Sequence, residues 1–216
     1  RWALLYGLNP VICFAFAGEG HNDAVQVFAL VAAVLAHDRR RWGWMWLALG
    51  LAVSAKYVAI VVWPFFLTRE SWKQLWLGML SALGPIGLTL AIDGTAIFDS
   101  LLAFGLEMSF NGPIHGILRW LTGSSELTNP IAHGLFLVLF SVGFMLLRPS
   151  RRSSTGTDPT SGAFFALALF LLLSPTVHFW YLSWLVPFLA LRPKASWLLL
   201  TGTLAFTYVP YGLEIQ

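Results

Sequence analysis

Long apolar runs follow one another along almost the whole chain, and short polar or charged stretches separate them. Several runs reach or approach the roughly 17 to 25 apolar residues with which a helix crosses the hydrocarbon core of a membrane. The apolar segments that this pattern predicts lie near residues 2–17, 23–36, 43–67, 75–92, 130–147, 162–174, 177–191 and 196–213. We therefore expect an all-α, polytopic bundle of transmembrane helices that forms a single domain over residues 1–216.

The composition supports a membrane protein and excludes other classes. Hydrophobic residues make up 57% of the chain and charged residues 11%, and the mean hydropathy is +0.72, whereas soluble domains carry about 25% charged residues. The basic residues form short clusters between apolar runs, so the net charge of +3 does not predict a nucleic-acid partner. Cys13 is the single cysteine, which excludes a disulfide framework and a thiolate zinc site.

The basic connectors predict the orientation of the bundle. They lie at residues 37–41, 148–152 and 192–194, and short loops rich in Lys and Arg stay in the cytoplasm. Residues 148–161 then form a cytoplasmic linker, and residues 93–129 form an extracytoplasmic loop. Because most acidic residues fall on the extracytoplasmic side, the polar chemistry is expected there.

This orientation places both ends of the apolar run 43–67 in the cytoplasm. We interpret the run as two short broken or re-entrant helices, about 43–54 and 57–67, with a turn at Ser54–Tyr57. Such irregular backbone is tolerated at membrane depth where protein or a wet cavity encloses it. The alternative is a single span, with a second inserted segment somewhere within residues 97–122.

Local sequence signals predict two further boundaries. Asn129-Pro130 favours a helix start, because Asn caps free amides and Pro is accepted at the first helical position. Ser174-Pro175-Thr176 predicts a turn between two helices at the extracytoplasmic side.

The densest polar motif is Gly18-Glu19-Gly20-His21-Asn22-Asp23-Ala24. It is either a hydrophilic hairpin in which Asn22 or Asp23 caps the next helix, or one wall of a site at the membrane surface. Four polar side chains within five residues exceed what a cap needs, which favours the site. Gln26 follows Asp23 by three residues, so both lie on one face of the predicted helix.

Lys56 is a lone cation within an apolar run. It either snorkels to the interface or faces an anionic group such as a lipid-linked phosphate, and the neighbouring Tyr57 would assist in the second case. At the other predicted turn, His178 and Tyr181 share a face and are expected to look into one cavity. For Trp180 we favour an interfacial aromatic belt.

The loop 93–129 combines polar residues with aromatic and aliphatic residues that suit the membrane interface. These are Glu107, Asn111, His115 and Arg119, and Phe98, Leu102, Phe110 and Trp120. Such a loop would cover a lipid-linked substrate. The sequence carries no nucleotide-binding glycine loop, no Ser/His/Asp hydrolase signature and no metal-ligand spacing, so we expect no metal and no cofactor.

The stretches 5–10, 18–24, 48–57 and 173–184, taken in order, resemble integral membrane glycosyltransferases of the GT-C class. More narrowly, they are similar to bacterial polyprenyl-phosphate-mannose-dependent mannosyltransferases, in which an Asn-Pro turn precedes a Gly-rich His-Asn-Asp motif. Phe179 stands where that family commonly has Pro before Trp-Tyr. The family's presumed catalytic acid lies in its first outer loop, so the resemblance implies a longer protein with this acid upstream of Arg1.

The resemblance implies that a sugar, most often mannose, passes from a polyprenyl-phosphate carrier to a hydroxyl of a glycan or glycolipid acceptor. The reaction would take place at the extracytoplasmic face of a bacterial plasma membrane, among membrane lipids. Asp23 and Glu19 are the candidate catalytic carboxylates. His21, Asn22, Lys56, Tyr57, His178 and Tyr181 are the candidate substrate-binding residues. The alternatives are a lipid-linked sugar flippase, an oligosaccharide polymerase or ligase, and a non-catalytic assembly subunit.

Overall fold

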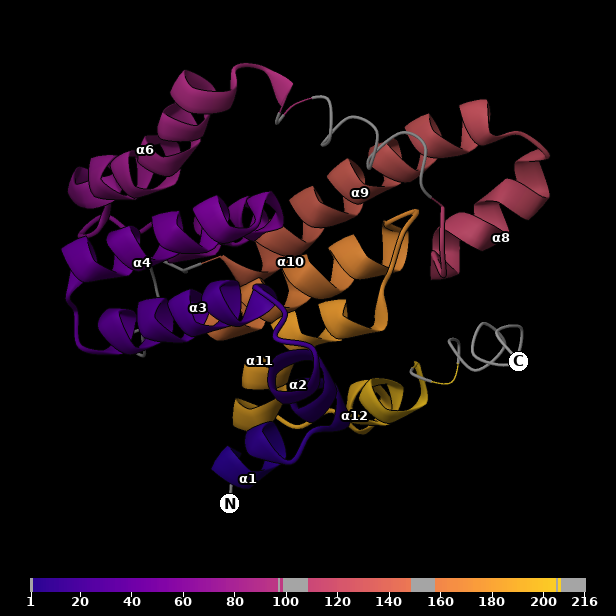
Figure 1. Ribbon diagram of the computed structural model, residues 1–216, viewed down its shortest axis with the longest axis horizontal. Helices are drawn as coiled ribbons and strands as arrows, with labels where there is room; N and C mark the ends of the chain where they lie inside the picture. The colour runs from indigo at the N-terminus through magenta and orange to yellow at the C-terminus, as the bar shows by residue number, and fades with distance from the viewer. Residues whose placement is uncertain (1, 97, 99–108, 149–157, 205, 207–216) are drawn as a thin grey trace.

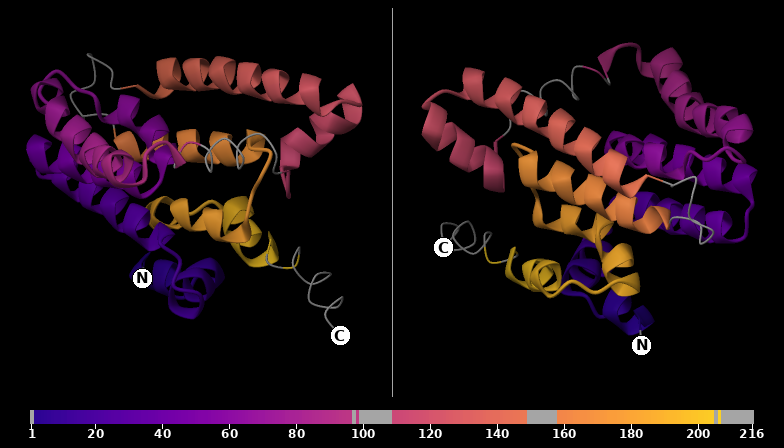
Figure 2. Two further views of the ribbon diagram at one scale, coloured as in Figure 1. Left: turned by 45° about the horizontal axis from the view of Figure 1, so that its top comes forward. Right: turned by 180° about the vertical axis from the view of Figure 1, so that it is seen from behind.

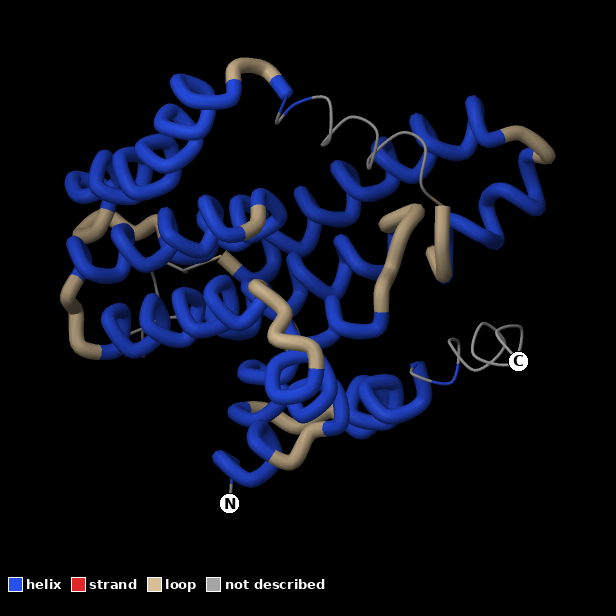
Figure 3. The backbone as a smooth tube through the Cα atoms, in the orientation of Figure 1, coloured by secondary structure: helices blue, strands red, loops and turns tan. Residues whose placement is uncertain are grey.

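The computed structural model describes residues 2–96, 98, 109–148, 158–204 and 206. Helices dominate this part of the chain (Figures 1 and 3), and its only extended pairing is a pair of isolated bridges from Phe110 and Asn111 to Thr176. The all-α prediction is confirmed. The expectations for Leu102 and Glu107, for most of the linker 148–161 and for the end of the segment 196–213 lie outside the described residues.

Three helices form one side of the bundle: α3 (Asp23–Asp38), α4 (Trp42–Ala55) and α6 (Leu75–Asp93). Helix α4 lies between the other two (Figure 1). Helices α4 and α6 touch at Gly50, where an added Cβ would collide with the carbonyl oxygen of Gly78. Small residues let membrane helices approach closely in this way. The Ser54 hydroxyl also donates to the carbonyl of Ser81 at 2.8 Å, so the two helices run in the same direction.

The apolar run 43–67 is a hairpin of two short pieces, as predicted. Helix α4 ends at Ala55, Lys56 is extended (φ −158°, ψ 119°), and the chain continues as the 3₁₀ helix η2 (Tyr57–Val62) and the helix α5 (Trp63–Phe66). The Trp63 indole donates to the carbonyl of Leu49 at 3.3 Å. The second piece therefore runs back along α4, and Lys56 lies at the turn.

Helices α9 (Ser125–Leu147) and α10 (Pro159–Leu173) are antiparallel, since Phe165 packs on Gly143 and Phe170 packs on Phe136. The predicted helix start at Asn129-Pro130 is wrong. Helix α9 begins four residues earlier and carries Pro130 in its interior. The first turn is instead stabilised by Thr128, whose hydroxyl donates to the carbonyl of Ser124 at 2.7 Å, and the Asn129 side chain is engaged by His115 of α8 (Pro113–Thr122) at 2.8 Å.

The predicted turn after α10 is confirmed. The chain reverses after Ser174 into the 3₁₀ helix η4 (Phe179–Trp184) and the helix α11 (Val186–Leu191). The Arg192 guanidinium then lies 2.6 Å from the Asp158 carboxylate, which precedes α10. Helix α10 and the η4–α11 segment therefore form an antiparallel pair whose turn lies far from Asp158.

The segment 2–17 was expected to be one membrane segment and is instead broken. It consists of α1 (Trp2–Gly7), α2 (Pro10–Ile12) and the π-helix η1 (Cys13–Gly18). The break lies at Asn9, whose side-chain oxygen accepts from the amide of Val11 at 3.1 Å and so starts a new helix. The Asn9 amide donates to Thr201 of α12 (Ala195–Thr203) at 3.0 Å, which joins α2 and α12 beneath the main bundle (Figure 2).

Two helical stretches are long and apolar enough to cross a membrane: Trp72–Asp93, which includes the short 3₁₀ helix η3 (Trp72–Gln74) and α6, and Glu126–Leu147 within α9. In the most apolar part of each stretch, only 11% of the residues are buried inside the protein. Their apolar side chains therefore face outward, as the lipid-exposed helices of a membrane protein do, whereas the core helix of a soluble protein is enclosed.

Candidate active site

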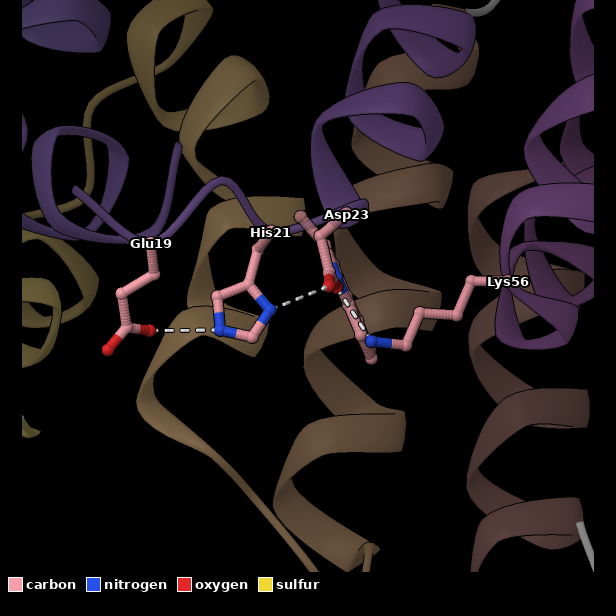
Figure 4. A network of polar contacts seen from close by, with 5 residues as sticks. Glu19, His21, Asp23 and Lys56 are labelled. Atoms are coloured by element: carbon pink, nitrogen blue, oxygen red, sulfur yellow. Dashed lines mark hydrogen bonds and ion pairs between the residues drawn. The ribbon is translucent and has the colours of Figure 1, made fainter. Parts of the chain in front are cut away.

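Three connections meet at one end of the bundle: the polar motif before α3, the turn at Lys56 and the turn after α10. Gly20 adopts a positive φ of 62°, which glycine accepts without steric cost. The amide of His21 then donates to the carbonyl of Ala15 at 2.8 Å. These two features bend the chain so that Asp23 becomes the first residue of α3 and points toward the other two connections (Figure 4).

Asp23 is at the centre of this site. Its side chain is 1% exposed, and its Oδ1 lies 2.7 Å from the Lys56 ammonium. The same oxygen accepts a hydrogen bond from the indole of Trp184. A buried carboxylate is tolerated only when a cation and hydrogen-bond donors compensate it. Asp23 is thus an internally paired anion, and the interpretation of Asp23 as a simple helix cap is wrong.

Lys56 points inward, to Asp23, and not along the lipid interface. Its Nζ lies 4.2 Å from the centroid of the Tyr181 ring and 4.9 Å from that of Trp184, and these two rings stack on each other at 4.5 Å. Aromatic faces attract a desolvated ammonium. The side chain nevertheless keeps 27% of its surface exposed, so the site around Lys56 is not fully closed.

His21 links Asp23 to the open rim of the site. Its Nε2 lies 3.0 Å from a Glu19 carboxylate oxygen, and its Nδ1 lies 4.0 Å from Asp23 Oδ2. Figure 4 shows the resulting row of Glu19, His21, Asp23 and Lys56. The Glu19 side chain is 42% exposed. The row therefore carries one accessible carboxylate at its outer end and one buried, paired carboxylate further in.

A column of stacked rings forms a second wall of the site. His21 stacks on Trp180 at 4.4 Å between centroids, Trp180 stacks on His178 at 4.4 Å with planes only 2° apart, and His178 stacks on Phe110 at 5.4 Å. His178 also meets the edge of Tyr181 at 5.3 Å, which confirms that these two residues share a face. Trp180, expected in an interfacial belt, lies instead between two imidazoles.

The start of the α8 segment is attached to the turn that carries His178. The amide of Phe110 donates to the carbonyl of Pro175 at 3.0 Å, and the amide of Val177 donates to the carbonyl of Phe110 at 2.7 Å. Gly112 lies so close that an added Cβ would stand 2.6 Å from the carbonyl oxygen of Ser174 and 2.7 Å from that of Pro175. The segment that leads into α8 therefore reaches the site through Phe110.

Several residues singled out in the sequence lie apart from this cluster. Tyr57 is half-buried in η2, and within the described residues it makes no hydrogen bond to Asp23 or Lys56. Asn22 is exposed and its side chain does not cap α3. His115 is buried against Asn129, and Arg119 is exposed on α8.

The sequence reasoning did not include Trp184 among the candidate site residues, and it expected Phe110 only at the membrane interface. Trp184 follows Tyr181 by three residues, so helical spacing alone would have placed it on the same face. Phe110 had no such signal, because its partners are far away in the sequence. Gln26 is fully buried on the Asp23 face, as predicted, and its amide finds no partner among the described residues.

No three His, Cys, Asp or Glu side chains lie close enough to hold a metal ion within the part of the chain that the structure describes. The site is therefore built from one buried ion pair, one accessible carboxylate and two imidazoles, framed by aromatic rings. Such a set can accept a proton, hold a hydroxylated ring and attract a phosphate.

Comparison with known proteins identifies the family. Residues 1–71 match the family model of the alpha-(1->6)-mannopyranosyltransferase N-terminal domain, and residues 109–215 match that of the MptB C-terminal domain. No curated protein and no solved structure matches the chain. Mannosyltransferases of this type need no cofactor. Residues from both matched regions meet in the site, since Asp23 and Lys56 lie in the first region and Trp184 lies in the second. The chain therefore belongs to the alpha-(1->6)-mannopyranosyltransferase family.

Proposed function

We propose that this mannosyltransferase is a multi-pass membrane enzyme of the GT-C type. It transfers mannose from a polyprenyl-phosphate carrier to a hydroxyl of a glycan or glycolipid acceptor at the extracytoplasmic face of a bacterial membrane. The observation that carries the proposal is the row of Glu19, His21, Asp23 and Lys56 at one end of a bundle whose basic connectors 37–41 and 192–194 lie at the other end.

The distribution of charge supports the sidedness of the site. The arginines 39–41 follow the far end of α3, and Arg192 lies beside Asp158 at the far end of α10. Short basic connectors stay in the cytoplasm, so the opposite end, with Asp23, faces outward. A flippase would need polar groups along a path through the membrane, whereas the paired groups of this site gather at one end.

Asp23 and Glu19 have different roles in this proposal. Asp23 already shares its charge with Lys56 and Trp184, so it positions the ammonium and the neighbouring imidazole. Glu19 is accessible and lies against His21, so it accepts the proton of the acceptor hydroxyl as that oxygen bonds to the anomeric carbon.

The cationic side of the site receives the leaving group. When the bond between the anomeric carbon and the phosphate oxygen breaks, the electron pair and the negative charge go to the phosphate. Lys56 and His178 stabilise that charge by ionic and hydrogen-bond contacts. The rings of Trp180 and Tyr181 contact the His178 imidazole and fix its orientation.

Mannose transfer from a polyprenyl-phosphate-mannose donor, measured in membranes that hold the full-length protein, tests the assignment. Asp23→Ala and Lys56→Ala should each abolish most transfer, by about 100-fold or more. Matched controls remove the same charges elsewhere: Asp38→Ala at the far end of α3, and Lys73→Ala in η3. Transfer that is unchanged in both site variants, or equally reduced in the controls, would contradict the assignment.

Cysteine labelling tests the sidedness independently of activity. Cys13 is exposed and must first be replaced. In that background, Asn22→Cys should react with a membrane-impermeant reagent from outside, and Lys73→Cys only after the membrane is opened, because both positions are exposed at opposite ends. The reverse pattern would place the site in the cytoplasm.

A further inference from the structure

A cavity of about 600 Å³ lies between α10, α11, the end of α9 and the start of α12. It is not part of the mannosyltransferase site. Its polar end, here called its mouth, is lined by Ser161, Arg192 and Lys194 at the start of α10, whereas the turn that carries His178 follows the end of that helix. The 15 residues of α10 separate the two by roughly 22 Å at 1.5 Å per residue.

The walls of this cavity are apolar and suit a hydrocarbon chain. They include Leu147, Phe165, Leu169, Leu172 and Phe188. Along α10, the lining residues extend from Ser161 to Leu172, which is about 17 Å at 1.5 Å per residue. The hydrocarbon thickness of one leaflet is about 15 Å, half that of the whole core. The lined stretch of α10 is therefore about as long as one acyl layer is thick.

The mouth of the cavity carries cations. The Arg192 guanidinium lies 2.6 Å from Asp158 and donates to the Ser161 hydroxyl, also at 2.6 Å. Lys194 has no carboxylate within 4.0 Å among the described residues, and its Nζ lies 5.3 Å from the centroid of the Phe164 ring. Asp158 offsets the charge of Arg192 but not that of Lys194, so the mouth is positively charged.

The aromatic residues at the mouth mark the depth of a membrane interface. Trp197 lines the cavity and meets the edge of Phe164 at 5.7 Å. Indole rings and basic side chains occur together at the level of the lipid headgroups. Basic pockets between membrane helices on the cytoplasmic side bind anionic headgroups, and the basic connectors 37–41 and 192–194 lie at this end of the bundle.

We propose that this cavity binds one anionic diacyl phospholipid of the cytoplasmic leaflet. Its phosphate lies at Lys194 and Arg192, and an acyl chain lies along the apolar face of α10 toward Leu172. The occupant is a phospholipid and not the sugar carrier, because the cavity opens at the end of the molecule opposite Asp23. The positive charge of the mouth complements the negative charge of a phosphodiester.

Native mass spectrometry of the full-length protein, delipidated and then exposed to phosphatidylglycerol or phosphatidylcholine, tests the proposal. One phosphatidylglycerol should remain bound, at least about 5-fold more strongly than phosphatidylcholine. Lys194→Gln should weaken phosphatidylglycerol by about 5-fold, whereas Lys73→Gln, an exposed lysine outside the cavity, should leave it unchanged. Leu172→Trp fills the apolar part without changing charge and should also release the lipid.

Three results would overturn this assignment. Equal retention of phosphatidylglycerol and phosphatidylcholine would show that the mouth does not select charge. Equal effects of Lys194→Gln and Lys73→Gln would show that the lipid is held elsewhere. Full displacement of phosphatidylglycerol by equimolar farnesyl phosphate would assign the cavity to a carrier lipid. None of these readouts depends on mannose transfer, so the result is separate from the proposed reaction.

Discussion

The two ends of the bundle each hold an ion pair of similar length in a different environment. Lys56 lies 2.7 Å from Asp23, whose side chain is 1% exposed, while Arg192 lies 2.6 Å from Asp158, whose side chain is 35% exposed. Aromatic rings enclose the first pair. The second lies at the mouth of a cavity and shares its guanidinium with Ser161.

This difference shows that burial, and not the distance between the charges, decides what an ion pair does. Water screens the Arg192–Asp158 pair, so the loss of one partner leaves an ion that water can solvate. Asp23 has no such access, so it depends on Lys56 and Trp184 for compensation. The buried pair ties α3, α4 and η4 together and fixes the geometry of the site, while the exposed pair only closes one end of α10.

Removing the cation of the buried pair should have the largest effect. Lys56→Met keeps a straight side chain and leaves the Asp23 carboxylate buried without its cation, which costs about 3 to 5 kcal/mol of stability. Mannose transfer should fall by about 100-fold or more. Thermal unfolding in detergent and the transfer assay measure both effects. Unchanged stability would mean that Asp23 is solvated in the membrane, and the contrast between the two ends would disappear.

Trp184→Phe should have the next largest effect. It keeps a ring beside Tyr181 and removes the indole N–H that Asp23 accepts. A hydrogen bond to a buried charge is worth about 1.5 to 3 kcal/mol, and stability should drop by that amount. Trp197→Phe, at the other end, removes an indole that donates no hydrogen bond within the described residues and serves as the control. An equal loss in the two variants would contradict a specific role for the Trp184 N–H.

Gly112→Ala should act through the loop that carries Phe110. The added Cβ would meet the carbonyl oxygens of Ser174 and Pro175, and backbone cannot yield as a flexible side chain does, so the expected cost is about 1 to 3 kcal/mol. Transfer should fall as Phe110 and His178 separate. Gly116→Ala, four residues on in α8, meets nothing within 4 Å and should be neutral or stabilising by up to about 1 kcal/mol. The midpoints of thermal unfolding of Gly112→Ala and Gly116→Ala measure this difference in stability.

Arg192→Met should have the smallest effect of the four. It removes the exposed pair with Asp158 at the cost of less than about 1 kcal/mol of stability, and added salt should reduce the difference further. Mannose transfer should stay within about twofold of the parent, since the pair lies roughly 22 Å from the site along α10. A stability loss equal to that of Lys56→Met would show that the Arg192–Asp158 pair is as poorly accessible to water as the Lys56–Asp23 pair.

Most of the local structure was readable from the sequence. The apolar periodicity and the basic connectors predicted the all-α bundle, the hairpin at Lys56 and the turn after Ser174, because hydropathy and loop charge act over short stretches of chain. The same reasoning brought Glu19, His21, Asp23, Lys56 and His178 to one end. It failed at the break at Asn9, where Asn9 caps and Pro10 begins a new helix inside a continuous apolar run. It also failed at the start of α9, where His115 engages the Asn129 side chain and Pro130 lies inside the helix.

The pairing within the site was decided only by the tertiary structure. The sequence left Lys56 either at the membrane interface or facing a lipid-linked phosphate, whereas the fold pairs it with Asp23 and supplies Trp184 as the second donor to that carboxylate. It also brought Phe110 onto His178. These partners lie 33, 161 and 68 positions apart in the chain. Local propensity carries no information over such separations, and a buried charge selects its partners only when packing has removed the water that would otherwise solvate it.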